Sequence, residues 1–390
     1  MPIVNLRDML QHAYAHQYAV GAFDLVGLGF LEGIMQAAES CRSPVILSLA
    51  ESHFDYFDFE LAMPAVEAAA RRATIPVAIH LDHGESLESV RQSINLGCNG
   101  VMVDASDQPF AENVLRTRAV VDLAHACGIP VEGELGYVPG VEGEDAERHP
   151  GEITYTTVEQ ARDYVDQTGV DFLAVSIGTV HGRMKGEPRL DMERLAQINQ
   201  VLNIPLVIHG GTGLSDAQFK TLIRNGVTKI NYFTALADAA GACIRTNADS
   251  SATGYTSMLK GARNAIAHEV ERCIRLWGSN NRAEDVLRHC EPWLPVDHVI
   301  LYNVSGISEK DALSMMAHGR TVLARIPGVR EVTTGTAIKK DADYRFTWLV
   351  RFCHPAVIDS YRDHPLHVDF ADNHFRPVAD KRISIDYQYL

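Results

Sequence analysis

Short apolar runs alternate with amphipathic segments over about the first 240 residues of the chain. The runs are Val20–Phe23, Val45–Ser48, Val77–Leu81, Val101–Asp104, Val131–Leu135, Phe172–Ile177, Leu206–His209 and Lys229–Phe233. Segments with helical spacing of apolar residues, such as Leu61–Arg71 and Leu87–Leu96, separate most of them. Short apolar runs that alternate with helices are typical of parallel strands buried on both faces. Eight such strands predict a (β/α)8 TIM barrel, an α/β fold, over residues 1–280.

The pattern changes beyond residue 280. Residues 281–295 begin with turn-forming residues and end at Pro295, so we expect a linker there. Two further helices and four strands are then expected in the order β-α-β-β-α-β. This order predicts a ferredoxin-like α+β domain over residues 296–390.

Composition narrows the range of functions. The 390 residues include 35 basic and 50 acidic side chains, for a net charge of −15. Such a charge disfavours nucleic acid or an anionic membrane as a partner. No apolar stretch approaches the roughly 18 residues of a membrane-spanning helix, and the first residues do not resemble a secretory signal. Seven scattered cysteines without a CxxC pair fit a reducing compartment, so we expect a cytoplasmic protein.

Polar side chains gather at the ends of four predicted strands. They are His80, Asp82 and His83 in the third, Glu132 and Glu134 in the fifth, His181 after the sixth and His209 in the seventh. The loops that follow the strands of a TIM barrel meet on one face, so these side chains are expected to lie together. Three neutral imidazoles suit Zn²⁺ with one position open for substrate. The sequence therefore predicts a divalent metal site.

Glycine-rich loops follow the last two predicted strands. They read HGGTG (209–213) and NYFTAL (231–236), at the position where TIM barrels often bind phosphate. Glycine lets backbone amides approach an anion closely, and threonine adds a hydroxyl donor. The candidate phosphate-binding residues are Gly182, Lys185, Gly210, Gly211, Thr212, Gly213 and Thr234. Beside a metal site, they predict a phosphorylated carbonyl compound as substrate.

Several motifs of the first 280 residues resemble one known family. LDHG, VMVDAS, ELG, IGTVHGRMKGEPRLD, IHGGTGL and VTKINYFTAL are similar, in this order, to the class II, metal-dependent ketose-bisphosphate aldolases. The resemblance implies zinc-dependent aldol cleavage or condensation of a ketose bisphosphate, such as fructose or tagatose 1,6-bisphosphate. The products of cleavage would be dihydroxyacetone phosphate and an aldehyde.

The same resemblance implies a role for individual residues. His83, His181 and His209 would hold the catalytic Zn²⁺, with Glu134 and Asp104 lining the metal site, where the family also places an alternative or second divalent ion. The dihydroxyacetone-phosphate pocket would comprise Gly182, Lys185, Gly210, Gly211, Thr212, Asn231 and Thr234. Backbone carbonyls around Gly182 and Gly210 would bind a monovalent cation, Na⁺ or K⁺. The family also implies a dimer built on the barrel, and a second dimerising domain could link two such dimers, so we expect a homodimer or homotetramer.

The reaction itself explains these residue types. A metal ion stabilises the negative charge of the enediolate as a Lewis acid. A carboxylate must take the proton of the C4 hydroxyl, and by the resemblance this is Asp82. Another group must protonate C3, and the family uses a glutamate in the loop after the fifth strand. Glu142 is the best match in that loop, with Glu144 as the alternative.

Some positions depart from the family pattern. Where the family often has Asn-x-Asp-Thr, this chain has Asn231-Tyr232-Phe233-Thr234, and Ala237 stands near the expected arginine. The second strand ends in Ala50-Glu51-Ser52-His53. These changes fall on the aldehyde half of the pocket, so we expect an aldehyde other than plain glyceraldehyde 3-phosphate. Two alternatives remain: a metal-dependent aldolase acting on a non-sugar catabolic substrate, and a catalytically silent ligand-binding relative.

Residues 298–387 resemble the stress-responsive A/B barrel (Dabb) domain, a dimeric ferredoxin-like fold. HVILYNV, IPGVREV, YRFTWLVRF, YRDHPLHVDF and HFRPVADKRISIDY carry the resemblance. It implies an oligomerisation module above all, with ligand binding or a second activity as the alternatives. Some relatives cyclise polyketides with pocket histidines and a tyrosine. His298, Tyr361 and His367 match such positions, whereas Phe346 stands where another histidine is expected.

Overall fold

The computed structural model describes residues 2–140, 144–145, 152–183, 188–250 and 253–388. Contacts within the chain divide it into two compact units. The first comprises Met1–Val90, Cys98–Val121 and Pro130–Pro292. The second comprises Trp293–Leu390 together with Arg91–Gly97 and Asp122–Ile129. In the described part of the chain, no helix is both long and apolar enough to cross a membrane.

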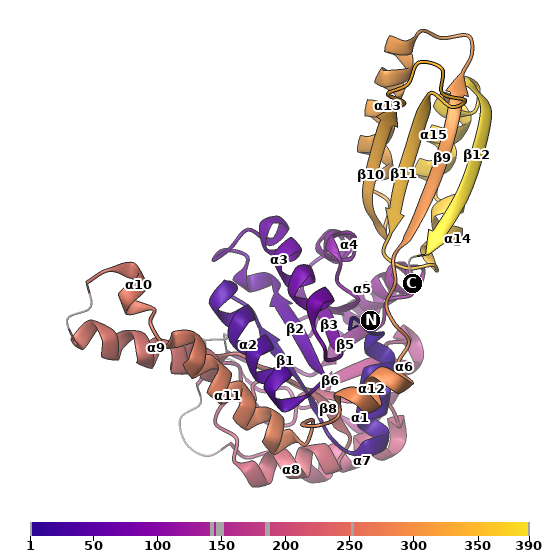
Figure 1. Cartoon of the computed structure of the whole chain (residues 1–390). Helices are drawn as coiled ribbons and strands as arrows, with labels where there is room; N and C mark the ends of the chain where they lie inside the picture. Colours follow the sequence, from indigo (N-terminus) through magenta and orange to yellow (C-terminus); the bar gives the residue numbers. More distant parts are fainter. Residues whose placement is uncertain (1, 141–143, 146–151, 184–187, 251–252, 389–390) are drawn as a thin grey trace. The chain divides into compact units, whose positions relative to one another are not determined.

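Eight parallel strands close into a barrel in the first unit, which confirms the predicted fold (Figure 1). The strands are β1 (Val20–Asp24), β2 (Val45–Ala50), β3 (Val77–Gly84), β4 (Gly100–Val103), β5 (Val131–Leu135), β6 (Phe172–Val175), β7 (Leu206–Ile208) and β8 (Val227–Tyr232). Neighbours in sequence pair along the barrel, and β8 pairs with β1 to close it. Nearly every strand residue is buried, because side chains fill the interior and helices cover the outside.

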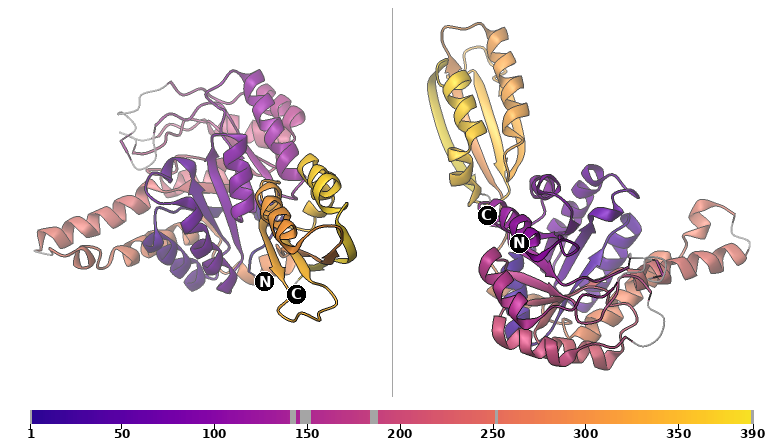
Figure 2. Two further views of the ribbon diagram at one scale, coloured as in Figure 1. Left: turned by 90° about the horizontal axis from the view of Figure 1, so that it is seen from above. Right: turned by 180° about the vertical axis from the view of Figure 1, so that it is seen from behind.

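Helices follow the strands, and most of them pack around the barrel, whereas α9 and α10 project away from it (Figure 2). They are α2 (Leu28–Cys41), α3 (Phe59–Arg72), α4 (Leu87–Leu96), α5 (Phe110–His125), α6 (Val158–Thr168), α7 (Met192–Leu202), α8 (Asp216–Arg224), α9 (Thr234–Asp249), α10 (Tyr255–Met258) and α11 (Ala262–Trp277), with the short 3-10 turn η1 (Glu51–His53) after β2. The sequence pattern predicts one helix over Ser257–Trp277, but α10 and α11 are separate. Gly261 divides them, with a left-handed backbone angle φ of 86° that favours glycine.

Two helices at the chain ends of the first unit lie side by side (Figure 1). They are α1 (Leu6–His16) and α12 (Ala283–His289). Leu6, Met9 and Leu10 of α1 join a buried cluster with apolar residues of the strands, and Val286 of α12 belongs to the same cluster. The segment 281–295, expected as a linker, thus contains a helix that packs on the first unit.

The second unit has an antiparallel sheet in the order β10-β11-β9-β12. Its elements are β9 (Val296–Val304), α13 (Glu309–Leu323), β10 (Val329–Thr336), β11 (Phe346–Phe352), α14 (Val357–Asp363), α15 (Pro365–Phe370), η3 (Ala371–Phe375) and β12 (Ala379–Gln388). The predicted ferredoxin-like topology is confirmed. Helices cover one face of the sheet (Figure 1), where alternate β11 side chains, such as Trp348 and Val350, are buried.

Candidate metal centre and active site

A local irregularity at the end of β3 brings two adjacent side chains to the same site. Successive residues of a regular strand point to opposite faces. Between Leu81 and Gly84 the pairing of β3 with β4 shifts register, and His83 has a left-handed φ of 46°. Such a bulge re-aims the side chain that follows it. Asp82 and His83 consequently both lie at the barrel mouth, where the Asp82 Oδ2 atom is 3.9 Å from His83 Nε2.

His83, His181 and His209 converge at this mouth from the ends of β3, β6 and β7. Their ring centroids are 5.0 Å apart for His83 and His181, 4.7 Å for His83 and His209, and 5.7 Å for His181 and His209. One nitrogen of each ring lies within 4.8 Å of those of the other two. The three histidines that the sequence analysis selects therefore form one cluster.

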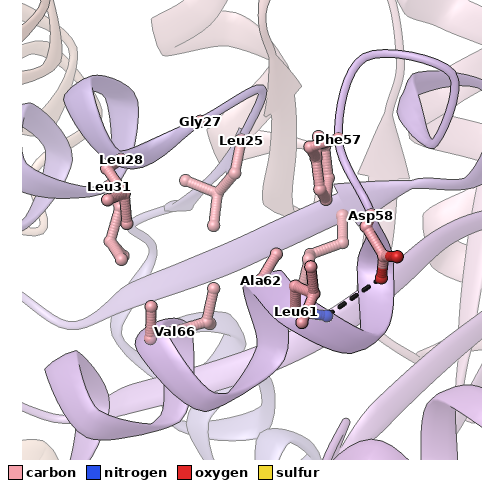
Figure 3. Close-up of a pocket in the computed structure, with 11 residues that line it drawn as sticks. Leu25, Gly27, Leu28, Leu31, Phe57, Asp58, Leu61, Ala62 and Val66 are labelled. Atoms are coloured by element: carbon pink, nitrogen blue, oxygen red, sulfur yellow. Dashed lines mark hydrogen bonds between the residues drawn. The ribbon is translucent and has the colours of Figure 1, made fainter.

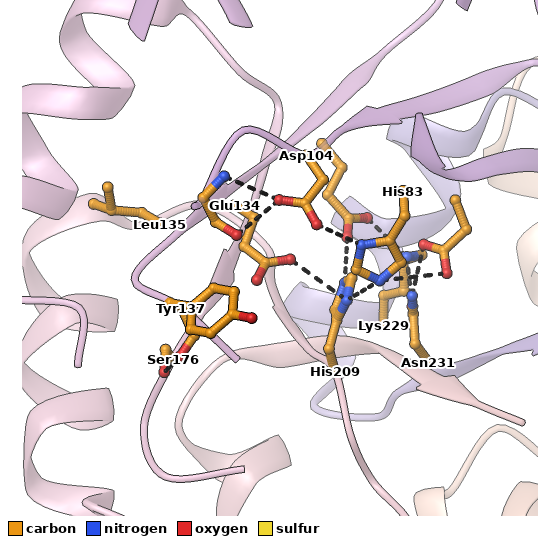
Figure 4. Close-up of polar contacts among 12 residues, drawn as sticks. His83, Asp104, Glu134, Leu135, Tyr137, Ser176, His209, Lys229 and Asn231 are labelled. Atoms are coloured by element: carbon orange, nitrogen blue, oxygen red, sulfur yellow. Dashed lines mark hydrogen bonds and ion pairs between the residues drawn. The ribbon is translucent and has the colours of Figure 1, made fainter. Parts of the chain in front are cut away.

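Carboxylates fix the orientation of two of these rings (Figure 4). His83 Nδ1 lies 2.8 Å from Oδ2 of Asp104, and His209 Nε2 lies 3.0 Å from Oε1 of Glu132. When each of these nitrogens donates its hydrogen, the lone pairs remain on His83 Nε2 and His209 Nδ1. Metal-binding histidines usually donate their other N–H group to a carboxylate in this way.

The two ring nitrogens that keep their lone pairs face each other, and the distance between them indicates whether the site suits a cation. His83 Nε2 and His209 Nδ1 are 2.9 Å apart. Two lone pairs at this distance repel each other unless a proton or a metal ion lies between them. In addition, the buried Oε2 atom of Glu134 has no hydrogen-bond partner among the described residues and lies 3.6 Å from His209 Nδ1. The donor set fits a zinc-type ion.

Asp104 and Glu134 form a second, overlapping group with His83 whose candidate ligand atoms also lie within 4.8 Å of one another. Burial and the nearby charge of Asp104 raise the pKa of Glu134 well above its ordinary value when no cation is bound. A pocket next to His83 is lined by Asp104, Ser106, Arg116 and Tyr137, among others. The metal-binding candidates are therefore reachable from outside the barrel.

A chain of buried polar contacts connects Asp82 to the ring of His209 (Figure 4). Asn231 Nδ2 donates to Asp82 Oδ1 at 2.7 Å, and Lys229 Nζ donates to Asn231 Oδ1 at 2.6 Å. Lys229 also forms an ion pair of 2.8 Å with Oε2 of Glu132, the carboxylate that binds His209. The sequence places Glu132 at the end of the fifth predicted strand without indicating a role for it, and Lys229 is not among the predicted site residues. Alternation along β8 could have shown that Lys229 shares an inward face with Asn231.

Electrostatics keep the carboxylate of Asp82 ionised. Burial alone would raise its pKa, but when the His83 ring carries a proton on both nitrogens, its positive charge and that of Lys229 outweigh burial and hold the pKa well below its ordinary value. An ionised, buried carboxylate with one oxygen held by Asn231 and the other close to the histidines can accept a proton from a bound substrate.

The candidate phosphate-binding loops lie at the same end of the barrel. Gly210 has a φ of 69°, and a Cβ atom there would come within 2.1 Å of the carbonyl oxygen of Val180, so only glycine permits this approach of two loops. Thr234 is buried at the first turn of α9, where backbone amides favour an anion. Gly182 and Gly211 are buried, and Thr212 is half-buried.

Lys185 and Glu142 lie outside the described residues, whereas the Glu144 carbonyl accepts a hydrogen bond from the amide of Arg183.

Two of the positions that depart from the family pattern, Phe233 and His53, carry rings that contact each other. Phe233 follows β8, and its ring lies 4.4 Å from that of His53, which is buried after β2. Phe30 of α2 also stacks on Phe233, with 5.8 Å between the ring centroids. An apolar pocket elsewhere on the first unit, between α2 and α3, is lined by Leu25, Leu61 and their neighbours and contains none of the candidate site residues (Figure 3).

The second unit carries its own polar cluster. His298 Nδ1 lies 2.7 Å from Asp386 Oδ1, and the rings of Tyr361 and His367 are 4.4 Å apart. The ring of His298 is 6.3 Å from that of Tyr361. Phe346 is buried and packs near Tyr302, so the position of the missing histidine belongs to the apolar core.

Comparison with protein-family models gives two matches. Residues 4–282 match the class-II fructose-bisphosphate aldolase family, and residues 296–389 match the Stress responsive A/B Barrel Domain. Curated relatives include a probable fructose-bisphosphate aldolase of Bacillus subtilis, 40% identical over 288 residues, and a fructose-bisphosphate aldolase of Staphylococcus aureus, 38% identical over 289 residues. Each match covers 73% of this chain and 100% of the relative.

Solved structures agree with this assignment. The YdjI aldolase from Escherichia coli K12 is 35% identical, with a TM-score of 0.65, over 72% of this chain and 99% of that one. A putative fructose-1,6-bisphosphate aldolase from Coccidioides immitis is 30% identical, with a TM-score of 0.66, over 72% of this chain and 98% of that one.

Proposed function

The chain belongs to the class-II fructose-bisphosphate aldolase family and carries a C-terminal Stress responsive A/B Barrel domain, and from this premise we propose that it is a zinc-dependent lyase that cleaves a phosphorylated ketose into dihydroxyacetone phosphate and an aldehyde. The observation that carries the proposal is the convergence of His83, His181 and His209 beside the buried carboxylate of Asp82. These three histidines would hold the ion. When bound, it supplies Lewis acidity toward the negative charge that develops on the substrate oxygens.

The protein's own side chains transfer the protons and bind the substrate. Asp82 accepts the proton of the C4 hydroxyl, the C3–C4 bond breaks, and its electron pair stays on C3. The aldehyde leaves with a new C4 carbonyl, and Glu142 then donates a proton to C3, with Glu144 as the alternative donor. Asn231 holds Asp82 in place through the 2.7 Å hydrogen bond. The loops with Gly182, Gly210 to Thr212 and Thr234, together with Lys185, bind the phosphate of the dihydroxyacetone half.

Additional cations complete the proposed site. Glu134 and Asp104, which share a cluster with His83, would hold a second or alternative divalent ion. Backbone carbonyls around Gly182 and Gly210 would bind Na⁺ or K⁺. The close approach of Gly210 to the Val180 carbonyl supports this assignment, because it brings the loops after β6 and β7 together.

The aldehyde half of the substrate differs, we propose, from plain glyceraldehyde 3-phosphate. Phe233 occupies the position where the family often has an aspartate, and it packs against His53 and Phe30. An aromatic surface favours apolar contact over hydrogen bonds to sugar hydroxyls. The same feature supports the second candidate, a metal-dependent aldolase that acts on a non-sugar substrate.

Zinc content and product release test this proposal together. The purified enzyme is assayed for dihydroxyacetone phosphate release from a panel of ketose phosphates, before and after chelation and after addition of Zn²⁺. We expect turnover of at least one compound, its loss on chelation and its recovery with zinc. Fructose 1,6-bisphosphate is expected to be a poorer substrate than the preferred compound.

Each other outcome has a distinct meaning. Equal rates with fructose 1,6-bisphosphate and the related sugars would contradict the proposed aldehyde preference. Bound zinc without release from any compound would favour the non-sugar substrate. Absence of zinc from protein equilibrated with it would contradict the catalytic role of the three histidines and favour a silent ligand-binding relative.

The second unit supports a homo-oligomer through the face of its sheet that the helices leave uncovered. Leu301 of β9 pairs with Ile383 of β12, and Val299 pairs with Ile385, so these four side chains share one face. Leu301, Ile383, Ile385 and Tyr387 are 38% to 49% exposed. We propose that this apolar face packs against the same face of a second copy, forming a homodimer or part of a homotetramer.

Substitution of Ile385 with glutamate is expected to lower the oligomeric state, because it places a charge at the centre of this face. Light scattering after gel filtration gives the mass of the particle. Ile338→Glu is the matched control, since Ile338 is fully exposed in the turn after β10 and outside the face. Unchanged mass for Ile385→Glu, or equal loss in both variants, would rule out this interface.

A further inference from the structure

A second cluster of metal-ligating side chains lies away from the barrel mouth, between α1 and α12. It comprises His12 and His16 of α1, and Asp285 and His289 of α12. Each pair is spaced four residues apart, which places its members on one side of their helix. One candidate ligand atom each from His12, Asp285 and His289 lies within 4.8 Å of the other two. None of these residues has a part in the proposed aldolase reaction.

The hydrogen bonds of the cluster leave nitrogen lone pairs available. His289 Nδ1 lies 2.8 Å from the carbonyl oxygen of Asp285, and His16 Nδ1 lies 2.8 Å from that of His12. A carbonyl only accepts, so both Nδ1 atoms donate and both Nε2 atoms keep a lone pair in the neutral rings.

His12 is the anchor of the cluster. Only 7% of its surface is exposed, and its Nδ1 atom lies 3.0 Å from the hydroxyl of Tyr18. Its Nε2 atom lies 3.2 Å from Oδ2 of Asp285. If Nε2 binds a metal, the ring hydrogen moves to Nδ1 and is donated to the Tyr18 oxygen. Tyr18 thus satisfies His12 in both tautomers.

The spacing of the donors suits a tetrahedral ion. Zinc binds histidine nitrogen and carboxylate oxygen at about 2.0–2.2 Å, which separates two donors by about 3.4 Å. The 3.2 Å between His12 Nε2 and Asp285 Oδ2 is close to this value. The side chain of His289 is 57% exposed, so it can turn its Nε2 atom toward the same point, and the fourth position opens to water.

We propose that His12, Asp285 and His289 bind a structural Zn²⁺ ion, separate from those at the barrel mouth, which joins the first helix of the barrel unit to its last. The ion would have a structural role, because it would add a bond between side chains of α1 and α12. The other contacts near these helices are the Val4–Pro292 bridge, the hydrogen bonds of Glu291 to Asn5 and Asp8, and the packing of α12 on the core cluster. This proposal does not depend on the proposed aldolase activity, since it concerns different residues and a different face of the unit.

Zinc stoichiometry tests the second site. Untagged full-length protein is stripped by chelation, equilibrated with a buffered low concentration of free Zn²⁺, and analysed for bound metal by mass spectrometry. The wild-type protein is expected to hold one zinc more than His289→Ala and one more than Asp285→Asn. His268→Ala is the control, because His268 is an exposed histidine of α11 outside the cluster.

A second measurement separates this site from the catalytic one. His289→Ala is expected to retain aldolase activity within about twofold while losing the additional zinc. Zinc should also raise the Tm of His209→Ala, in which a proposed catalytic ligand is absent, by more than it raises that of His209→Ala/His289→Ala. Equal zinc content in wild type, His289→Ala and Asp285→Asn would overturn the proposal, whatever the outcome of the aldolase assay.

Discussion

Replacement of Asp82 with asparagine is expected to lower kcat by about 10²- to 10⁴-fold, the usual contribution of a positioned general base. Asparagine has the same shape and still offers Oδ1 to the amide of Asn231, so the hydrogen bond of 2.7 Å can persist. What is lost is the carboxylate that accepts the C4 proton. The KM and the zinc content should change little, because Asp82 is not among the three histidines proposed to bind the ion.

Asp104→Asn provides the contrast that separates a base from a positioning residue. Asp104 holds Nδ1 of His83 at 2.8 Å, and substitutions at such positions typically weaken metal binding by about 10- to 100-fold. Excess zinc should therefore restore most of the activity of Asp104→Asn and none of that of Asp82→Asn. An Asp82→Asn enzyme that turns over within tenfold of wild type, fully loaded with zinc, would remove Asp82 from the reaction.

The barrel and much of its candidate site could be predicted because both follow from strand periodicity. Eight apolar runs give the number of strands. A position just after a strand places a side chain such as His181 or His209 at the carboxyl end of the barrel. The order of strands and helices in the second unit could be predicted from the same periodicity. Its uncovered face follows from alternation once the pairing of Leu301 with Ile383 is known.

Other features depend on contacts that no local pattern contains. Strict alternation would send Asp82 and His83 to opposite faces, and only the bulge with its left-handed His83 brings them together. Lys229 is a charged residue within an apolar strand, and its role depends on Glu132, which is distant in the chain. The helix α12 follows a short run of turn residues, and its seven residues are too few to form a stable helix alone, so it depends on packing against α1.

Replacement of Lys229 with methionine is expected to destabilise the protein by about 3–5 kcal/mol, because it leaves a buried charge without its partner. Lys229 and Glu132 are both fully buried, with 2.8 Å between Nζ and Oε2. Methionine fills a similar volume, so the loss reports on charge more than on packing. The double variant Lys229→Met/Glu132→Gln removes both charges, and glutamine still accepts from His209. Its free energy of unfolding in urea should exceed that of the single variant.

The pH dependence of this loss identifies its cause. Burial alone would raise the pKa of Glu132, but Lys229 and then the His209 hydrogen bond lower it to about 2. In the wild type, this carboxylate therefore stabilises the fold above its unfolded pKa of about 4.3, and the contribution is lost as the pH falls toward 2. Without Lys229 we expect burial to raise the pKa of Glu132 in the folded protein above its unfolded value, so that this carboxylate would destabilise the fold as the pH rises. The difference in unfolding free energy between wild type and Lys229→Met should thus grow from pH 4 to pH 7, whereas a pH-independent difference would point to packing and not to the ion pair.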